Sequence, residues 1–312
     1  MKSQRSKKKV CILLCTFNGE KFLSEQLDSI YSQTHKNWVV FASDDGSSDS
    51  TLDILKYYQK IWPPGTLKIR AGKQKGFAHN FLSLACDPKI NGDYYAFCDQ
   101  DDIWLPSKLE IAIQNISKNS ASDELYLYCG RTHYVSDKIK SLRDSPLFPY
   151  PRSFRNALVQ SIAGGNTMLF NQPIKSVFEI TGILEVPSHD WWLYLLVEAL
   201  GGKVFYDPIP YILYRQHSSS LVGSCDSVPA KFKRFVLLMQ NRFKYWNDLH
   251  INALDKVKFM MTNECKDVLA QFVRLRNSNL LHRLRMIEVC GLYRQGWRGA
   301  LSLYIAAIFN KM

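Results

Sequence analysis

Short apolar runs that end in polar turns constrain the fold of this chain more than any other feature. Between these runs, apolar residues recur every three or four positions, as they do on the buried side of an amphipathic helix. Strands and helices that alternate in this way predict an α/β fold with a mostly parallel sheet and helices on both faces. The runs with the length and composition of buried strands are Val10–Cys15, Trp38–Ala42, Leu67–Arg70 and Tyr94–Cys98.

The alternation continues into the second half of the chain and then stops. A helix is expected from His189 to Leu200, and further strands near 125–129, after the glycine-rich turn in 162–170, and at 204–206 and 211–214. Past residue 224 the spacing becomes helical and the charge turns positive. We therefore predict a basic tail at 1–9, an α/β domain at 10–224 and a basic helical region at 225–312.

The positive charge is concentrated at the two ends of the chain. The formal net charge is +12, of which residues 1–9 carry +5, residues 225–312 carry +9 and the middle carries −2. Basic ends attract anionic lipid or nucleic acid, and each cation near an anionic leaflet contributes about 1 kcal/mol. A solvated helical surface would have the same composition, so charge alone does not separate these interpretations.

The cysteines and the apolar runs indicate a cytoplasmic protein. There are eight cysteines and no CxxC pair, and Cys11 and Cys98 fall inside apolar runs. Small buried thiols fit this pattern better than disulfides or zinc. The apolar run after the basic N-terminus is too short for a signal peptide, and no apolar stretch reaches the roughly 20 residues that span a bilayer.

Three carboxylates lie within four residues after the fourth apolar run, at Asp99, Asp101 and Asp102. They repel one another, and a divalent cation with oxygen ligands would compensate this repulsion. Bound Mg²⁺ or Mn²⁺ also holds a diphosphate and neutralises charge on a leaving nucleotide. The alternative is an ordinary surface turn, because aspartate favours turns.

Other polar residues have a functional and a structural interpretation. Asp44 and Asp45 also follow a predicted strand, where α/β sheets bind ligands, but they would equally suit a turn before a helix. Asp190 either caps a helix or acts as a general base toward an acceptor hydroxyl. Arg215 has the guanidinium group that suits a phosphate clamp, and the nearby His217 is either structural or a metal ligand.

Taken together, five sequence features resemble glycosyltransferase family 2, whose members have the GT-A fold. Each feature is weak alone, and their order along the chain makes the combination specific. They are Cys15-Thr16-Phe17-Asn18-Gly19, Leu27-x-Ser29-Ile30-x-x-Gln33-Thr34, Asp44-Asp45-Gly46-Ser47-Ser48-Asp49, Asp99-Gln100-Asp101-Asp102-Ile103-Trp104-x-Pro106-x-Lys108 and His189-Asp190-Trp191.

The resemblance implies a role for each matching position. Asp99, Asp101 and Asp102 would hold Mn²⁺ or Mg²⁺, with Asp101 as the direct ligand, and His217 would complete the metal site. Asp190 would be the base of an inverting transfer, in which the acceptor hydroxyl attacks the anomeric carbon opposite the nucleotide. The nucleotide sugar would be held by Cys15, Thr16, Asn18, Asp44, Asp45, Asn80, Asp99 and Arg215.

Two departures from the family pattern refine this expectation. The QxxRW motif of processive members is absent, which implies that one sugar is added per encounter. Cys15 occupies a position often held by proline or a small residue, so the contacts to the base stay open. The strings 98–104 and 214–217 are similar to the rhamnosyltransferase-like branch, which implies a UDP- or dTDP-sugar donor and a bacterial surface polysaccharide such as O-antigen or capsule.

The resemblance also gives the basic end a function. An oligosaccharide or lipid-linked acceptor would place the protein peripherally on the inner face of the cell membrane, with no nucleic-acid partner. The alternative is a helical cap over the acceptor side of the main domain. The residues expected to meet the membrane are Lys231, Lys233, Arg234, Arg283, Arg285, Arg294, Arg298, Trp297 and Tyr304.

Two other classes of protein compete with this assignment. A sugar-phosphate nucleotidyltransferase would have a glycine-rich loop with a basic residue after the first strand, and the turn at 16–19 lacks the basic residue. A non-catalytic membrane or nucleic-acid binding protein would not need Asp99, Asp101 and Asp190 together. A glycosyltransferase accounts for all these features.

Overall fold

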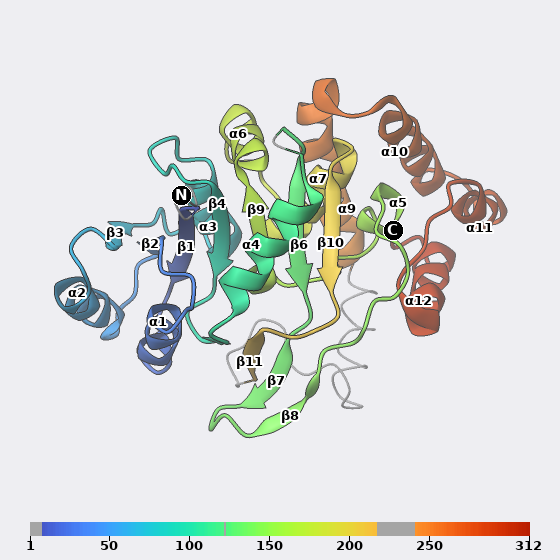
Figure 1. The fold of residues 1–312 in the computed structure, drawn as a ribbon. Coiled ribbons are helices and arrows are strands. Elements are labelled where there is room, and N and C mark those ends of the chain that lie inside the picture. The colour runs from blue at the N-terminus through green and yellow to red at the C-terminus, as the bar shows by residue number, and fades with distance from the viewer. Residues whose placement is uncertain (1–7, 122, 217–240) are drawn as a thin grey trace. The chain divides into compact units, whose positions relative to one another are not determined.

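The computed structural model describes residues 8–121, 123–216 and 241–312. The chain divides into two compact units and passes between them several times, as the colours of Figure 1 show. Residues up to 145, 163–184 and 205–215 form the first unit, and residues 146–162, 185–204 and 216–312 form the second. Parts of the predicted 10–224 domain thus group with the C-terminal helices. The boundary predicted near residue 224 lies outside the described residues.

A seven-stranded sheet organises the first unit (Figure 1). In spatial order its strands are β10 (Lys203–Asp207), β6 (Tyr126–Gly130), β9 (Leu169–Asn171), β4 (Tyr94–Cys98), β1 (Val10–Thr16), β2 (Trp38–Asp44) and β3 (Leu67–Ala71). β1 pairs in parallel with β2 and β4, and β2 pairs in parallel with β3. β9 runs antiparallel to β4 and β6. The predicted mostly parallel sheet is confirmed.

Helices cover both faces of this sheet, and β1 is therefore buried along its whole length. Alternate side chains of a strand point to opposite faces. On one face Ile12 shares a core with Leu27, and on the other Phe97 packs 5.4 Å from the ring of Phe81. The helices are α1 (Leu23–Tyr31), α2 (Thr51–Ile61) and α4 (Lys108–Asn119) on the first face, and α3 (Phe77–Ala85) and α6 (Gln172–Thr181) on the second.

A second, four-stranded sheet was not predicted as such. Its strands are β5 (Ile103–Trp104), β11 (Ile212–Gln216), β7 (His133–Ser136) and β8 (Ser141–Asp144), in that order. Only β11 has an apolar run that the sequence analysis recognised. β5 has two residues and β8 is exposed throughout, so neither gives a hydrophobic signal. Strand β5 of this sheet comes directly after the acidic segment 99–102 in the chain.

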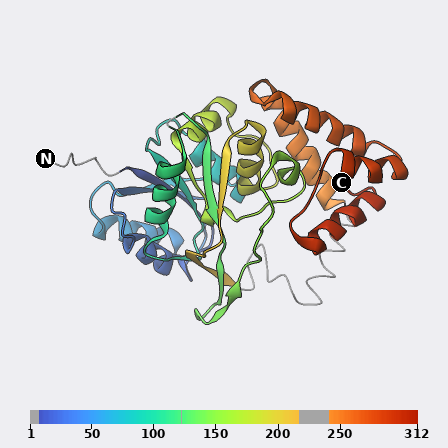
Figure 2. The ribbon, with the colours of Figure 1, turned by 45° about the vertical axis from the view of Figure 1, so that its right-hand side comes forward.

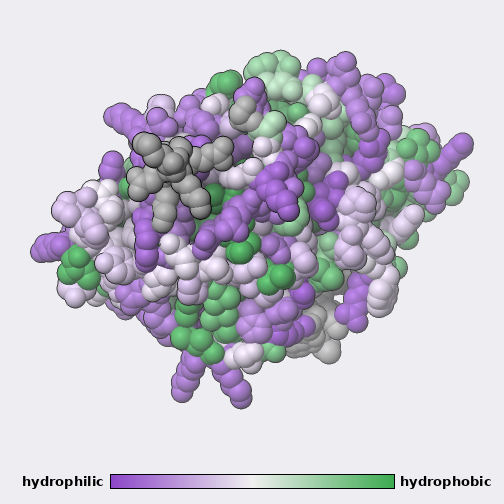
Figure 3. Space-filling view, in the orientation of Figure 1, coloured by the Kyte–Doolittle hydropathy of each residue, from purple (hydrophilic) through white to green (hydrophobic). Residues whose placement is uncertain are grey.

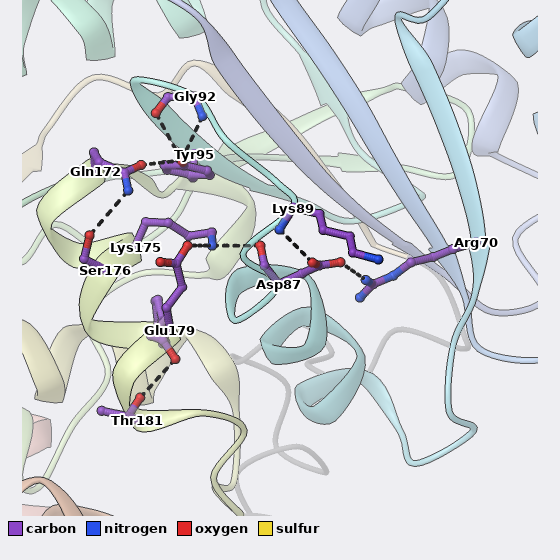
Figure 4. Close-up of polar contacts among 11 residues, drawn as sticks. Arg70, Asp87, Lys89, Gly92, Tyr95, Gln172, Lys175, Ser176, Glu179 and Thr181 are labelled. Carbon is purple, nitrogen blue, oxygen red and sulfur yellow. Dashed lines mark hydrogen bonds and ion pairs between the residues drawn. The ribbon is translucent and has the colours of Figure 1, made fainter.

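A polar cluster fastens α3 and α6 to the main sheet (Figure 4). The ammonium group of Lys175 is fully buried, donates to the Asp87 carbonyl at 3.0 Å and pairs with Glu179. The Asp87 carboxylate, just past α3, accepts a hydrogen bond from Arg70 of β3 at 2.8 Å. A buried charge is tolerated only when it is paired in this way. The cluster therefore fixes the end of β3.

The second unit is helical. α7 (His189–Ala199) packs on α5 (Phe154–Ala157), where the indole N–H of Trp191 donates to the Ala157 carbonyl at 2.7 Å. The ring of Trp191 lies 4.6 Å from His250 of α9 (Arg242–Val257). Figure 2 shows the later helices packed side by side; they are α10 (Asn263–Arg276), α11 (Leu280–Val289) and α12 (Gly296–Ile308). None of the helices in the described ranges has the length and apolarity to cross a membrane.

The structure corrects two of the cations that were expected at a membrane surface. Arg283 is only 5% exposed and donates to the carbonyls of Ala307 and Ser278 at 2.7 and 2.6 Å. Arg294 lies 4.5 Å from the ring of Phe243, and burial lowers its pKa to about 10. Both side chains stabilise the helical unit. Lys231, Lys233 and Arg234 lie outside the described residues.

Candidate functional site

Polar residues from three neighbouring strands meet at one edge of the main sheet. In the register of the parallel strands, Thr16 of β1 lies opposite Asp44 of β2, and β4 ends at Cys98 on the other side of β1. The carboxyl ends of parallel strands are where α/β sheets bind ligands. The structure brings to this edge five residues predicted to bind the nucleotide sugar: Cys15, Thr16, Asp44, Asp45 and Asp99.

The Asp44 carboxylate organises the turn after β2. Its Oδ1 accepts hydrogen bonds from the hydroxyls of Thr16 at 2.8 Å and Ser47 at 2.6 Å, and its Oδ2 accepts from the Ser47 amide at 2.9 Å. The hydroxyl of Ser47 in turn accepts from the amide of Asn18 at 2.9 Å. Asp44 therefore joins the loops after β1 and β2 and is only 4% exposed.

The Asp45 carboxylate performs the same task one strand further along. Its two oxygens accept from the amides of Gln74 and Gly76 at 2.7 and 3.0 Å. A Cβ atom at Gly72 would lie 2.6 Å from Asp45 Oδ1 and 2.9 Å from Asn80 Oδ1, so only glycine allows this close approach. Asp45 thus holds the loop after β3 against the end of β2.

A pocket of about 310 Å³ opens where β2 and β3 end. Its walls include Asp44, Leu52, Ile69 and Gln74, which combine apolar surface with hydrogen-bonding groups. Nearby, Asn80 is 1% exposed and is joined to Ser43 by two hydrogen bonds of 2.6 and 2.8 Å. The pocket is large enough for a small planar group, whereas Asn80 supports the pocket from behind.

Cys15 and Gln100 shape the loop after β1. Burial raises the pKa of the Cys15 thiol well above its usual range, so this thiol is unreactive and acts as a small apolar side chain. The side-chain amide of Gln100 accepts from the Phe17 amide at 2.8 Å and donates to the Phe17 carbonyl at 3.0 Å. Sequence reasoning missed Gln100, because this pairing joins loops that lie 83 residues apart.

The three clustered carboxylates have different environments. Asp99 and Asp101 are partly exposed at the edge of the sheet, whereas Asp102 is 1% exposed. The Asp102 carboxylate accepts from the side-chain amide of Asn166 and, at 3.4 Å, from the backbone amide of Arg215. Burial, and then the charge of Asp101, raises the pKa of Asp102 to about 8. The geometry therefore argues against Asp102 as a metal ligand. Instead, the hydrogen bonds of Asp102 hold the acidic loop, residues 99–102, in place.

The environment of Arg215 also differs from the one expected of a phosphate clamp. Its guanidinium group is 1% exposed and donates to the carbonyls of Asp101 and Asp137 at 3.1 and 2.6 Å and to the carboxylate of Glu25 at 2.7 Å. These contacts direct the donors of the group inward, which argues against a phosphate clamp. Instead, Arg215 holds the backbone of Asp101 in place from β11, the strand that pairs with β5.

The remaining metal prediction rests on Asp99 and Asp101. Within residues 8–121, 123–216 and 241–312, no group of three or more His, Cys, Asp or Glu side chains is arranged to hold a metal ion. An ion at this site would therefore need ligands from outside the protein. Carboxylate oxygens are the ligands that Mn²⁺ and Mg²⁺ prefer, and both ions readily complete their shell with phosphate oxygens and water. The two carboxylates fit an ion shared with a diphosphate. The predicted ligand His217 lies outside the described residues.

Asp190 lies in the first turn of α7, in the second unit. Its Oδ1 accepts from the Trp191 amide at 2.7 Å, and a helix N-terminus stabilises a carboxylate. Burial lowers the pKa of the neighbouring His189 to about 4, so its imidazole is neutral near pH 7. The contacts of Trp191 with α5 and α9 hold this turn rigidly, which is what a positioned general base requires.

Sequence comparison finds a family and several relatives. The model of "Glycosyl transferase family 2" matches residues 11–178. The chain is 31% identical over 261 residues to the dTDP-rhamnosyl transferase RfbG of Shigella flexneri, covering 79% of this chain and 86% of that protein. It is 32% identical over 114 residues to the UDP-Glc:alpha-D-GlcNAc-diphosphoundecaprenol beta-1,3-glucosyltransferase WfgD of Escherichia coli, covering 36% of this chain and 43% of that protein.

Solved structures share the fold at low sequence identity. TarS residues 1–349 of S. aureus, in complex with UDP-GlcNAc, has a TM-score of 0.54 and 17% identity, covering 80% of this chain and 72% of that chain. The mannosyltransferase PcManGT of Pyrobaculum calidifontis, in complex with GDP-Man and Mn²⁺, has a TM-score of 0.53 and 15% identity, covering 98% and 88%. The predicted GT-A type of fold is confirmed.

Proposed function

The chain belongs to glycosyltransferase family 2, and from this premise we propose that it transfers a single sugar, with inversion, from a UDP- or dTDP-sugar to a hydroxyl of a saccharide acceptor. One observation carries the proposal. The loops shaped by Asp44 and Asp45 and the acidic loop of Asp99 and Asp101 lie at the same edge of the sheet. A nucleotide and its diphosphate would need these two loops together.

The nucleotide would lie across the ends of β1, β2 and β3. The pocket beside Asp44 and Gln74 suits a pyrimidine base, which offers an N–H between two carbonyl groups. Asp45 and Asn80 would act indirectly by holding the walls of that pocket. The exposed Asn18 would meet the ribose, whereas Thr16, which is 2% exposed, would act through its hydrogen bond to Asp44. Among possible donors, dTDP-rhamnose is the first candidate, because the relative with 86% coverage is a dTDP-rhamnosyl transferase.

The diphosphate would lie beside the acidic loop. Asp101, with Asp99, would hold Mn²⁺ or Mg²⁺, and such an ion supplies positive charge that stabilises a departing nucleoside diphosphate. Arg215 supports this arrangement from behind by fixing the carbonyl of Asp101. Asp102 supports it through Asn166. In this proposal, the orientation of the acidic loop is set by residues that would not touch the substrate.

The acceptor would be activated by Asp190. This carboxylate would remove the proton of the acceptor hydroxyl while the hydroxyl oxygen attacks the anomeric carbon opposite the diphosphate. The neutral His189 next to it adds no positive charge that would weaken the base. The bond to the nucleotide breaks as the new bond forms, so the configuration at the anomeric carbon inverts.

The relatives and the basic helices support a proposal for the acceptor class. WfgD is named for a diphosphoundecaprenol-linked acceptor, and RfbG and WfgD are both bacterial. We propose a lipid-linked oligosaccharide of a bacterial surface polysaccharide as acceptor. The protein would meet this acceptor on the inner face of the cell membrane as a peripheral protein.

A panel of donors tests the proposed function without an acceptor. UDP-glucose, UDP-galactose, UDP-GlcNAc, dTDP-rhamnose and GDP-mannose are added separately, with Mn²⁺ or with EDTA, and the thermal midpoint of unfolding is measured. We expect stabilisation by a pyrimidine donor in Mn²⁺ only. A ligand present at 100 times its Kd stabilises the folded state by about 2.7 kcal/mol.

The same panel provides the contradicting outcomes. Equal stabilisation in EDTA would reject the metal, and stabilisation by GDP-mannose alone would reject the pyrimidine pocket. If no donor shifted the midpoint at millimolar concentration, the assignment of this edge as the donor site would be wrong.

A further inference from the structure

The last helix exposes a continuous apolar stripe. In α12 the side chains of Leu303, Ala306 and Ala307 are buried at 1%, 0% and 0% exposure, and they face the helical unit. The opposite side contains Trp297, Leu301, Tyr304 and Ile308. With 100° per residue, these four positions lie within an arc of about 60°. They therefore form one line along the helix.

The exposure of this stripe is unusual for a folded protein. Trp297 is 71% exposed, Leu301 is 53% and Ile308 is 47%, and Phe309 directly after the helix is 48% exposed. Single exposed apolar side chains are common, but a row of large ones indicates an interaction surface. A further exposed apolar side chain lies on α11. Leu281 of α11 is 82% exposed, and Figure 3 shows apolar surface over α11.

The charges around the stripe identify the kind of partner. No acidic residue follows Glu288 in the sequence, whereas Arg294, Arg298 and Lys311 do. The guanidinium of Arg294 packs against the ring of Phe243 within the helical unit. Arg298 is exposed beside the stripe, and its guanidinium lies 5.2 Å from the ring of Trp297. The acid nearest the end of this segment is Asp248, which is paired with Arg276 at 2.6 Å. An exposed apolar face with an exposed cation at its border suits an anionic lipid surface.

A second copy of the chain fits this surface less well. Pairing two stripes would bring Arg298 and Lys311 of each copy close together, and residues 289–312 contain no Asp or Glu side chain to pair with them. A helix of 13 residues is about 20 Å long, which is too short to cross a bilayer but suits a position in the plane of the interface. Tryptophan favours that interface.

We propose that α12 is the membrane-docking element of this protein, with Trp297, Leu301, Tyr304 and Ile308 inserted among anionic lipids and Arg298 at the headgroups. This inference deepens the peripheral membrane contact proposed above and rests on it. It replaces the earlier expectation for Arg283 and Arg294, which the fold uses internally.

Vesicle binding tests the docking face. The full-length protein is sedimented with vesicles of phosphatidylglycerol and phosphatidylcholine in equal amounts, or of phosphatidylcholine alone. We expect binding to the anionic vesicles, and a loss of about tenfold or more in affinity for the double variant Trp297→Ser/Leu301→Ser. The matched control is Ile180→Ser, since Ile180 is a 65% exposed apolar residue of α6, and it should bind as the wild type does.

A second measurement covers the case in which the double variant fails to fold. Trp297→Phe keeps an aromatic ring at an exposed position, so it should fold normally. Brominated lipid should quench part of the tryptophan fluorescence of the wild type, and this part should be missing in Trp297→Phe. Equal quenching in both proteins, or vesicle binding by the double variant at wild-type affinity, would overturn the proposal.

The remaining outcomes separate this inference from the proposed function and from self-association. A wild-type protein that is dimeric without vesicles, together with a monomeric double variant, would assign the stripe to a second copy and overturn the lipid proposal. If the pyrimidine donor still raises the thermal midpoint but no vesicle binding is seen, the docking proposal alone fails. Vesicle binding without any donor effect would instead reject the donor site.

Discussion

Asp101→Ala is expected to abolish metal-dependent turnover of the donor sugar. The variant removes the carboxylate that, with Asp99, would hold the divalent ion beside the diphosphate. An ion that stabilises the departing diphosphate by several kcal/mol accounts for about 10³-fold or more in rate. The rate of donor hydrolysis should be measured as a function of Mn²⁺ concentration, with the donor that the thermal panel identifies.

The control for Asp101→Ala is an exposed carboxylate that does not line the pocket. Asp53 lies on α2 with a side chain that is 82% exposed and makes a 3.6 Å ion pair with Lys56. Asp53→Ala should hydrolyse the donor at the wild-type rate. Both variants should have the wild-type thermal midpoint without ligand. Full Mn²⁺-dependent hydrolysis by Asp101→Ala would exclude this carboxylate as a metal ligand.

Asp190→Asn is expected to retain donor binding and lose sugar transfer. The amide has the shape of the carboxylate and can keep the hydrogen bond from the Trp191 amide, but it cannot accept the proton of an acceptor hydroxyl. The absence of a positioned general base lowers the rate by roughly 10²- to 10⁴-fold. The measurement is the transfer of radiolabelled sugar to solvent-extracted lipid-linked saccharides, at saturating donor concentration.

Two comparisons make the Asp190 experiment decisive. The thermal stabilisation by donor and Mn²⁺ should be the same in Asp190→Asn as in the wild type, because the predicted role concerns only the acceptor. Glu185→Gln, at an exposed acid shortly before α7, should transfer at the wild-type rate. Unchanged transfer by Asp190→Asn would remove this residue as the base.

The fold of the main sheet was predictable because its signal is local. Runs such as Val10–Cys15 and Tyr94–Cys98 are continuously apolar, since strands covered by helices on both faces bury every side chain. The second sheet escaped prediction for the opposite reason. β8 is exposed along its length and β5 contains two residues, so their pairing depends on neighbours that are distant in the sequence.

The candidate site was predictable by residue type but only partly by role. The positions of Asp44, Asp45 and Asp99 follow from strand ends, which the sequence marks. Whether a side chain points toward a ligand or back into the protein depends on burial and partners, which residue type does not reveal. Asp102 and Arg215 illustrate this, because each belongs to a motif yet is 1% exposed and bound to other parts of the fold.

The most direct test of the account is the position of the metal. Crystals grown with Mn²⁺ and the nucleoside diphosphate of the identified donor would be measured for the anomalous scattering of manganese. The account predicts one strong peak in contact with a carboxylate oxygen of Asp101 and with the diphosphate, and a pyrimidine base at the ends of β2 and β3. Nucleotide bound at this edge with manganese elsewhere, or nucleotide bound at another surface, would contradict it.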